Sequence, residues 1–177
     1  MKREQLNWFA TLRQTKRDGT LIRKAVPSED GRLIAIPGWY SGLAVVSVPE
    51  KRLLWETPGR DIGGIADASF SPDGKTVYCG GSDGCVYQMD SATGIALHEW
   101  WANNEDRSKY GQRITSIAVS GDGRLVAAGT GPEGLVYVAT AAGEKVRVFS
   151  HGITVYTLSF SPDSKSLATV AGGKIKI

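Results

Sequence analysis

The stretch from Phe149 to Ile177, FSHGITVYTLSFSPDSKSLATVAGGKIKI, decides the fold of this chain. An alternating segment, Thr154–Phe160, meets a Ser-Pro-Asp turn and is followed by a strand of small residues, Ser166–Val170. A Gly-Gly turn then leads into a second alternating segment, Lys174–Ile177. Because alternation with a period of two is typical of half-buried strands, the stretch predicts three antiparallel strands joined by tight turns.

The same pattern occurs three more times upstream. Two clear copies are ADASFSPDGKTVYCGGSDGCVYQMD (Ala66–Asp90) and TSIAVSGDGRLVAAGTGPEGLVYVAT (Thr115–Thr140), and a weaker one is KAVPSEDGRLIAIPGWYSGLAVVSV (Lys24–Val48). Alignment on the first turn places four residues at one position, spaced by 43, 49 and 41 residues: Gly31, Gly74, Gly123 and Ser164. Glycine suits this position because the turn requires a positive φ. Such a period, with four strand-sized segments per copy, is typical of the blades of a β-propeller.

We therefore predict an all-β fold, a β-propeller with four four-stranded antiparallel blades per chain. The blades are expected at about residues 21–58, 64–101, 113–150 and 153–177. The expected strands are Leu21–Val26, Leu33–Ile36, Leu43–Val48 and Arg52–Trp55 in the first blade; Ala66–Phe70, Thr76–Cys79, Cys85–Met89 and Ile95–Trp100 in the second; Ile114–Val119, Leu125–Ala128, Leu135–Ala139 and Lys145–Phe149 in the third; and the three segments named above in the fourth. No segment shows sustained helical periodicity, so almost no helix is expected.

In turn, strand order and period, residues 21–177 resemble the WD-repeat β-propeller family in a degenerate, bacterial style. Met89-Asp90 and Ala139-Thr140 stand where the family has its Trp-Asp dipeptide. His151 occupies the histidine position of the family's buried hydrogen-bond network in the fourth blade, and Asp83 occupies the partner aspartate position in the second. Because no blade has both residues, we expect apolar packing alone to hold the blades.

The resemblance also implies how the ring closes. Residues 1–20 are expected to form an N-terminal segment whose strand, Asn7–Leu12, completes the last blade. Flat WD-type blades favour rings larger than four, and closure buries the sheet edges. We therefore expect this chain to be half of an eight-bladed ring, formed by a homodimer or with another propeller-bearing chain.

Charge and composition set limits on partners and location. Residues 1–24 hold seven basic and two acidic side chains, which favours a solvated leader, although a contact with nucleic-acid phosphates stays open. No run of 18 apolar residues and no signal peptide is visible, so neither a membrane partner nor secretion is expected. With only two cysteines the cytoplasm is the expected location.

The sequence offers no case for catalysis. Gly129–Gly134 spells G-x-G-x-x-G, but a strand rather than a helix follows, so the segment is interpreted as a hairpin turn. Cys79 and Cys85 flank another turn and are expected to be buried thiols rather than a disulfide or metal ligands. The innermost strands carry only Asp67 and hydroxyl groups. We expect no enzyme activity, no cofactor and no metal.

Two long connections, Pro37–Gly42 and Trp101–Gln112, carry residue types that are common in protein interfaces. The candidate partner-binding residues are Trp39, Tyr40, Trp101, Arg107, Lys109 and Tyr110. Folding of these aromatic side chains onto the rim of the propeller explains them equally well. The leading functional hypothesis is a non-catalytic scaffold or assembly subunit that binds other proteins. The alternative is a propeller enzyme or small-molecule binder with a pocket at the channel mouth.

Overall fold

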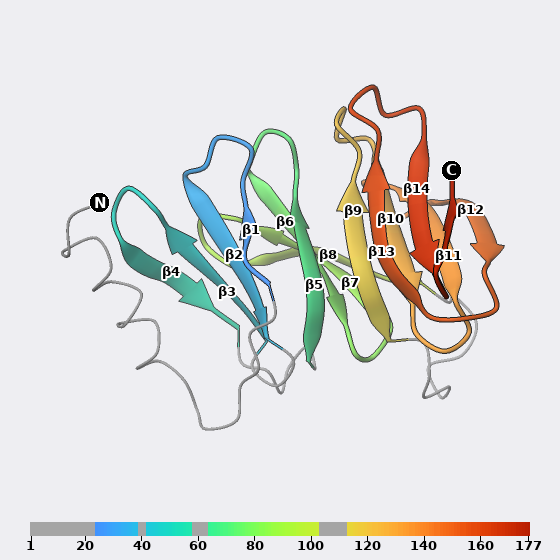
Figure 1. The fold of residues 1–177 in the computed structure, drawn as a ribbon. Helices are drawn as coiled ribbons and strands as arrows, with labels where there is room; N and C mark the ends of the chain where they lie inside the picture. The colour runs from blue at the N-terminus through green and yellow to red at the C-terminus, as the bar shows by residue number, and fades with distance from the viewer. Residues whose placement is uncertain (1–23, 39–41, 58–63, 103–112) are drawn as a thin grey trace.

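The computed structural model describes residues 24–38, 42–57, 64–102 and 113–177. Within these ranges all regular structure is β-strand, and it forms four separate antiparallel sheets (Figure 1). The first sheet contains β1 (Val26–Pro27), β2 (Leu33–Gly38), β3 (Gly42–Ser47) and β4 (Arg52–Glu56); the second β5 (Ile65–Phe70), β6 (Thr76–Gly81), β7 (Cys85–Asp90) and β8 (Ala96–Trp101); the third β9 (Ile114–Val119), β10 (Leu125–Thr130), β11 (Leu135–Thr140) and β12 (Lys145–Ser150); and the fourth β13 (Val155–Phe160), β14 (Leu167–Ala171) and β15 (Lys174–Lys176). The described part of the chain contains no apolar helix of membrane-spanning length.

Every sheet is a simple meander in which strands adjacent in sequence pair with each other. This confirms the predicted strand order, and β9 has the predicted bounds. Several strands run further than predicted because pairing continues close to the hairpin turn, as in β10, which ends at Thr130. The loop predicted at Pro37–Gly42 is wrong in its bounds, since Pro37 pairs with Leu43 and Gly38 with Gly42.

The first turn of each repeat is built in the same way. Gly31, Gly74, Gly123 and Ser164 have φ values of 69°, 68°, 72° and 60°, so the predicted positive φ is confirmed in all four copies. In the second copy the Ser71 hydroxyl donates to Asp73 Oδ1 at 2.6 Å and accepts from the Thr76 amide at 3.0 Å. The hydroxyl of Ser71 is the main reason that the pKa of Asp73 lies below its usual value.

This turn network repeats with equivalent residues in the other sheets. Ser28, Ser120 and Ser161 each donate to the aspartate two residues further on at 2.6 Å. The pKa values of Asp30, Asp122 and Asp163 are lowered as well, chiefly by those serine hydroxyls. The sequence motif is therefore Ser-x-Asp-Gly or Ser-x-Asp-Ser, in which the serine and aspartate bond to each other and the fourth residue has a positive φ.

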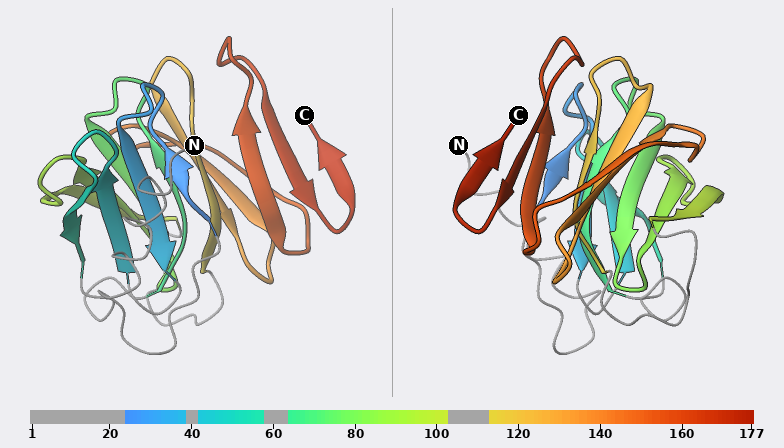
Figure 2. Two further views of the ribbon diagram at one scale, coloured as in Figure 1. Left: turned by 60° about the vertical axis from the view of Figure 1, so that its left-hand side comes forward. Right: turned by 90° about the vertical axis from the view of Figure 1, so that its right-hand side faces the viewer.

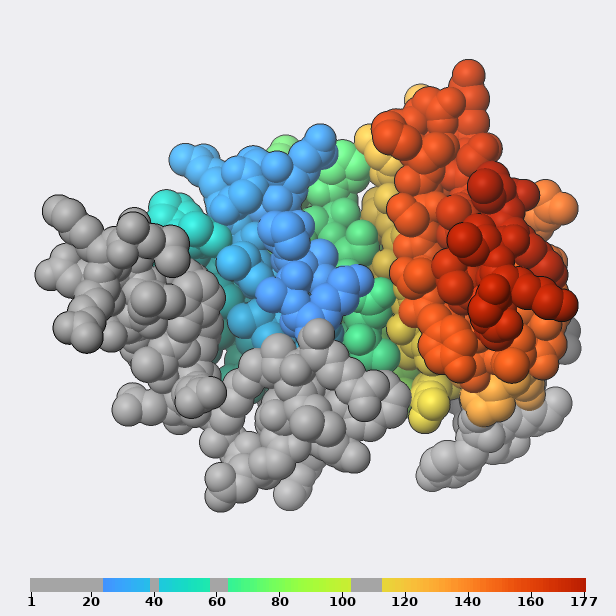
Figure 3. Space-filling view, in the orientation of Figure 1, coloured from blue at the N-terminus to red at the C-terminus, as the bar shows by residue number. Residues whose placement is uncertain are grey.

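The four sheets stand side by side with their first strands adjacent (Figures 1 and 2). β5 packs against β1 and β9, and β9 packs against β13. In the space-filling view the green and yellow surface of β5 and β9 lies between the blue first sheet and the orange-red fourth sheet (Figure 3). Buried side chains form three apolar clusters, one at each junction between neighbouring sheets.

Two tryptophans on outer strands pack across two of these junctions. Trp55 on β4 lies so near Gly94 that a Cβ there would come within 2.5 Å of its ring. Trp100 on β8 lies against Gly143 of the next sheet, where a Cβ would come within 2.7 Å. The Trp55 indole also donates to the carbonyl of Ser91 at 2.9 Å. Each ring thus packs on a tight turn of the following sheet.

The four antiparallel sheets are consistent with propeller blades. The fourth sheet has three strands in the described residues, and Lys174, Ile175 and Lys176 of β15 are all exposed. The strand expected at Asn7–Leu12, with the whole segment 1–20, lies outside the described residues.

Candidate functional site

One residue of each repeat, seven positions before the aligned turn residue, faces the region where the sheets converge. We call these residues the inner layer: Lys24, Asp67, Ser116 and Thr157. Lys24 precedes β1, and the other three lie on β5, β9 and β13. Three members are joined by hydrogen bonds around Asp67. The repeat alignment could have found this layer, but Lys24 was assigned to the solvated leader.

Asp67 is the centre of the inner layer and is only 5% exposed. Its Oδ1 accepts from Lys24 Nζ and from the Ala68 amide, both at 2.8 Å. Its Oδ2 accepts from the Ser116 hydroxyl at 3.1 Å and from the Ile117 amide at 3.0 Å. Both carboxylate oxygens are thus occupied, and they connect the second sheet to the third and to the residue that precedes β1.

Polar contacts continue from the third sheet to the fourth. The Ser116 hydroxyl accepts from the Leu158 amide at 3.2 Å, and the Thr115 hydroxyl donates to the Val155 carbonyl at 2.6 Å. The expectation that apolar packing alone holds the blades is therefore wrong. Most buried polar groups in proteins have hydrogen-bond partners, and those of Asp67 and Ser116 lie across the junctions between sheets.

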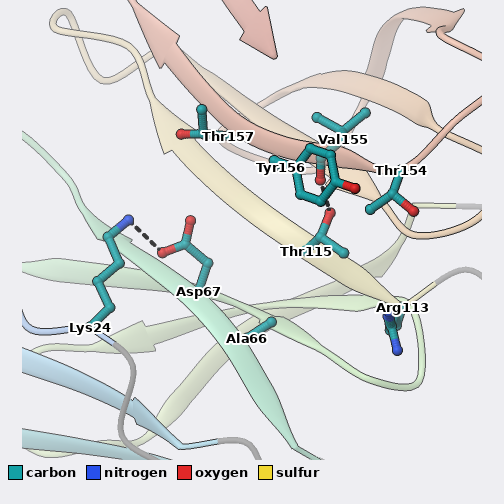
Figure 4. A pocket seen from close by; sticks show the side chains of 9 residues that line it. All are labelled: Lys24, Ala66, Asp67, Arg113, Thr115, Thr154, Val155, Tyr156 and Thr157. Carbon is teal, nitrogen blue, oxygen red and sulfur yellow. Dashed lines mark hydrogen bonds and ion pairs between the residues drawn. The ribbon is translucent and has the colours of Figure 1, made fainter. Parts of the chain in front are cut away.

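A hollow of about 460 Å³ opens beside the inner layer (Figure 4). All four repeats contribute to its wall, which is lined by Lys24, Ala66, Asp67, Arg113, Thr115, Thr154, Val155, Tyr156 and Thr157. In the close-up view Lys24 and Asp67 lie at one end, Arg113 lies at the other, and the Tyr156 ring stands beside Thr115 (Figure 4). Sequence reasoning identified Asp67 and the hydroxyls but missed Lys24 and Arg113, which precede the strands.

Of the six predicted partner-binding residues, the structure describes Trp101. It is the last residue of β8 rather than the first of a loop, and it pairs with Cys85. Its half-buried side chain packs against the apolar cluster between the first and second sheets. The other five candidates, Trp39, Tyr40, Arg107, Lys109 and Tyr110, lie outside the described residues.

The other sequence motifs have structural roles. Gly131 and Gly134 form the turn between β10 and β11, which confirms the hairpin interpretation. Cys79 and Cys85 are buried free thiols, as predicted, and burial raises the pKa of Cys85 to about 12. Within the described ranges no cluster of three His, Cys, Asp or Glu side chains could hold a metal ion.

His151 and Asp83, which the resemblance assigns to one buried hydrogen-bond network, have separate partners in the structure. His151 Nε2 lies 2.8 Å from the hydroxyl of Thr169, which is 1% exposed. Burial, with a smaller contribution from the charge of Lys176, lowers the pKa of His151. In the second sheet the Tyr87 phenol donates to Asp83 Oδ2. His151, in the connection between β12 and β13, thus has its polar partner on β14, and Asp83, in the turn before β7, has its partner on β7.

Comparisons with known proteins agree with the repeated sheets. Residues 53–90 and 143–177 match the family described as WD domain, G-beta repeat. Each match begins at the end of one sheet and continues to the third strand of the next. The chain is also similar to the human U3 small nucleolar RNA-associated protein 18 homolog, with 28% identity over 164 residues. The alignment covers 88% of this chain and 28% of the length of that protein.

Proposed function

We propose that this chain, which matches the WD domain, G-beta repeat family over residues 53–90 and 143–177, is a non-catalytic scaffold that binds other proteins through its exposed strands. WD repeats typically mediate protein interactions, so the family supports this class of function. We choose the protein-binding surface from the exposed apolar side chains of the described residues.

The observation that carries the proposal is where these side chains lie. Six large apolar residues on or beside the last strands of the second, third and fourth sheets are at least 37% exposed: Ile95, Leu97, Val146, Val148, Ile175 and Ile177. Apolar groups gathered on edge strands favour pairing with another chain, because the strand edge adds unpaired backbone groups to the apolar contact. These outer strands are the protein-binding surface in our proposal.

We extend the proposal to assembly. The exposed edge of β15 accepts a strand from a second copy or from another propeller-bearing chain, and the pair completes a larger ring. A cytoplasmic location belongs to the same proposal. Light scattering should then give twice the chain mass of 19.0 kDa for a homodimer, whereas pairing with another protein requires that partner.

The name of the human relative associates that protein with a small nucleolar RNA. A partner that contains nucleic acid is therefore a second candidate for this chain, and the basic segment 1–24 would supply the phosphate contacts. Binding through phosphates should fall steeply as salt rises, whereas apolar strand contacts should be nearly insensitive to salt.

The test places a charge on the proposed surface without disturbing the core. Leu97→Lys and Ile175→Lys change side chains that are 53% and 69% exposed, so both variants should fold normally. Each should weaken capture of a native partner at least tenfold. Lys75→Ala, in an exposed turn, is the control and should bind like the parent. Equal losses in all three variants would contradict the proposed surface.

A further inference from the structure

A groove of about 620 Å³, which we call the edge groove, lies between the third and fourth sheets. Most of its lining comes from β12, β14, β15 and the turn before β14; β12 and β14 are at the right of Figure 1. Seven apolar side chains line it, and two of them, Val146 and Ile177, are 57% and 89% exposed. The groove therefore offers apolar surface next to the exposed strand β15.

The edge groove also carries positive charge. Its lining includes Arg147, Lys165 and Lys176, all exposed, and no Asp or Glu side chain is among the described residues that line it. The Lys176 ammonium donates to the Ser150 carbonyl at 3.4 Å, which leaves N–H groups for a further acceptor. Within the described ranges neither Arg147 nor Lys165 forms a side-chain ion pair. The groove thus fits an occupant that brings carboxylates.

Comparison of the repeats indicates that the occupant is a strand. Trp55 and Trp100 are the last residues but one of β4 and β8, and each packs on the turn before the last strand of the next sheet, at Gly94 and Gly143. Phe149 has the same position on β12, but the next sheet has no fourth strand in the described residues, and the Phe149 ring lines the edge groove. A strand paired to β15 would cover this ring.

We propose that the edge groove binds an extended, acidic segment of a different protein, which pairs with β15. Apolar side chains of the segment pack on Val146, Phe149 and Ile177, and its carboxylates bind Arg147 and Lys176. The basic segment 1–24 of a second copy would bring like charge, with seven basic against two acidic side chains. The apolar lining favours a protein over a nucleic acid. This inference rests on the strand pairing proposed above and names the chemistry of its partner.

Three probes distinguish the possible occupants. The full chain is titrated with an acetylated peptide of seven alternating glutamate and valine residues, with its counterpart that has lysine for glutamate, and with an oligo-thymidine of equal negative charge. NMR follows the amide resonances. The glutamate peptide should shift the amides of residues 147, 167 and 176 in a saturable way, and the other two probes should bind at least tenfold more weakly. Equal or tighter binding of the lysine peptide or of the oligo-thymidine overturns the proposal.

Matched variants locate the site. Arg147→Gln and Lys176→Gln should each raise the Kd of the glutamate peptide at least fivefold, and Val146→Ser about threefold. Lys174→Gln, which removes an exposed lysine of β15 outside the groove lining, should leave the Kd within twofold of the parent value. Thermal melting shows whether each variant is folded.

The proposal is overturned if the glutamate peptide does not bind the parent chain at 2 mM, or if folded Arg147→Gln and Lys176→Gln bind it like the parent. A dimer of the parent chain that excludes the peptide would also overturn it, but the proposed function would stand. Loss of native-partner capture by Ile175→Lys, without any binding of the peptide, likewise contradicts this inference alone.

Discussion

Replacement of Asp67 by alanine should be one of the most damaging single changes in this protein. The substitution removes the acceptor of four hydrogen bonds, and two of their donors are the amides of Ala68 and Ile117 on inner strands. A buried donor left without a partner costs about 1–3 kcal/mol. Water entering from the adjacent hollow offsets part of this cost, so we expect a loss of about 2–4 kcal/mol in the free energy of unfolding.

Two related variants give the expected order of effects. Asp67→Asn keeps one acceptor oxygen but turns an NH₂ group toward other donors, so it should lower the free energy of unfolding by about 1–3 kcal/mol. Lys24→Met should lose less than about 1 kcal/mol, because the half-exposed ammonium of Lys24 contributes little to stability as an ion-pair partner. Glu29→Ala, at an exposed carboxylate in the turn after β1, is the control for removal of a negative charge.

Urea denaturation followed by tryptophan fluorescence measures these differences, with equal slopes required for the comparison. The reasoning would be refuted if Asp67→Ala unfolded within 0.5 kcal/mol of the parent, about the usual effect of a surface substitution. It would also be refuted if Lys24→Met were as harmful as Asp67→Ala. In that case the ion pair, and not the buried amides, would dominate.

Three further predictions concern the turns, the pH dependence and β8. Gly74→Val places a β-branched side chain at a φ of 68° and should lower stability by about 1–2 kcal/mol in a thermal melt, whereas Ser164→Thr, at a site already held by a non-glycine residue, should cost less. Because the folded pKa values of Asp30, Asp73, Asp122 and Asp163 lie below 3.8, their contribution to stability is complete above that pH and is lost as the pH falls through the folded values. Because the pKa of His151 is lowered in the folded state, a further loss of stability should begin as the pH falls below about 6.5. Urea midpoints measured between pH 2 and 8 check both the histidine and the aspartate contributions. Ser71→Ala should reduce the loss of stability at acid pH that arises from Asp73. Trp101→Ala should cost about 1–3 kcal/mol by lost packing, and an unchanged melting temperature would contradict the position of this side chain against the apolar cluster.

The sequence predicted the strand order because turn chemistry and alternation are local properties. Ser71–Gly74 requires only its own side chains to form the turn, so the four copies could be aligned without knowledge of the fold. Lys24 and Asp67 lie 43 residues apart in the sequence, so neither local pattern could predict the ion pair between them. Alternation identifies two faces of a strand, but it does not say which residue at a strand end points toward the neighbouring sheets.

The bounds of loops were less predictable for a related reason. Pro37 and Gly38 are residue types that commonly end strands, yet they pair with β3 because the partner strand continues opposite them. Trp101 was read as a loop aromatic, but its pairing with Cys85 and its packing between the first two sheets place it at the end of β8. In both places tertiary pairing overrides local preference.

The hydroxyl of Ser116 has a consequence for cooperativity. In most repeat arrays each unit contacts only its immediate neighbours, so the stability of the array is the sum of the stabilities of its units and of the interfaces between them. Here one oxygen donates to a carboxylate on β5 and accepts from an amide on β13, two sheets further along. We therefore expect loss of order in the second sheet to change the protection of the Leu158 amide against solvent exchange, which hydrogen-exchange NMR can measure. On this basis we expect the second, third and fourth sheets to open as one cooperative unit rather than as three independent ones.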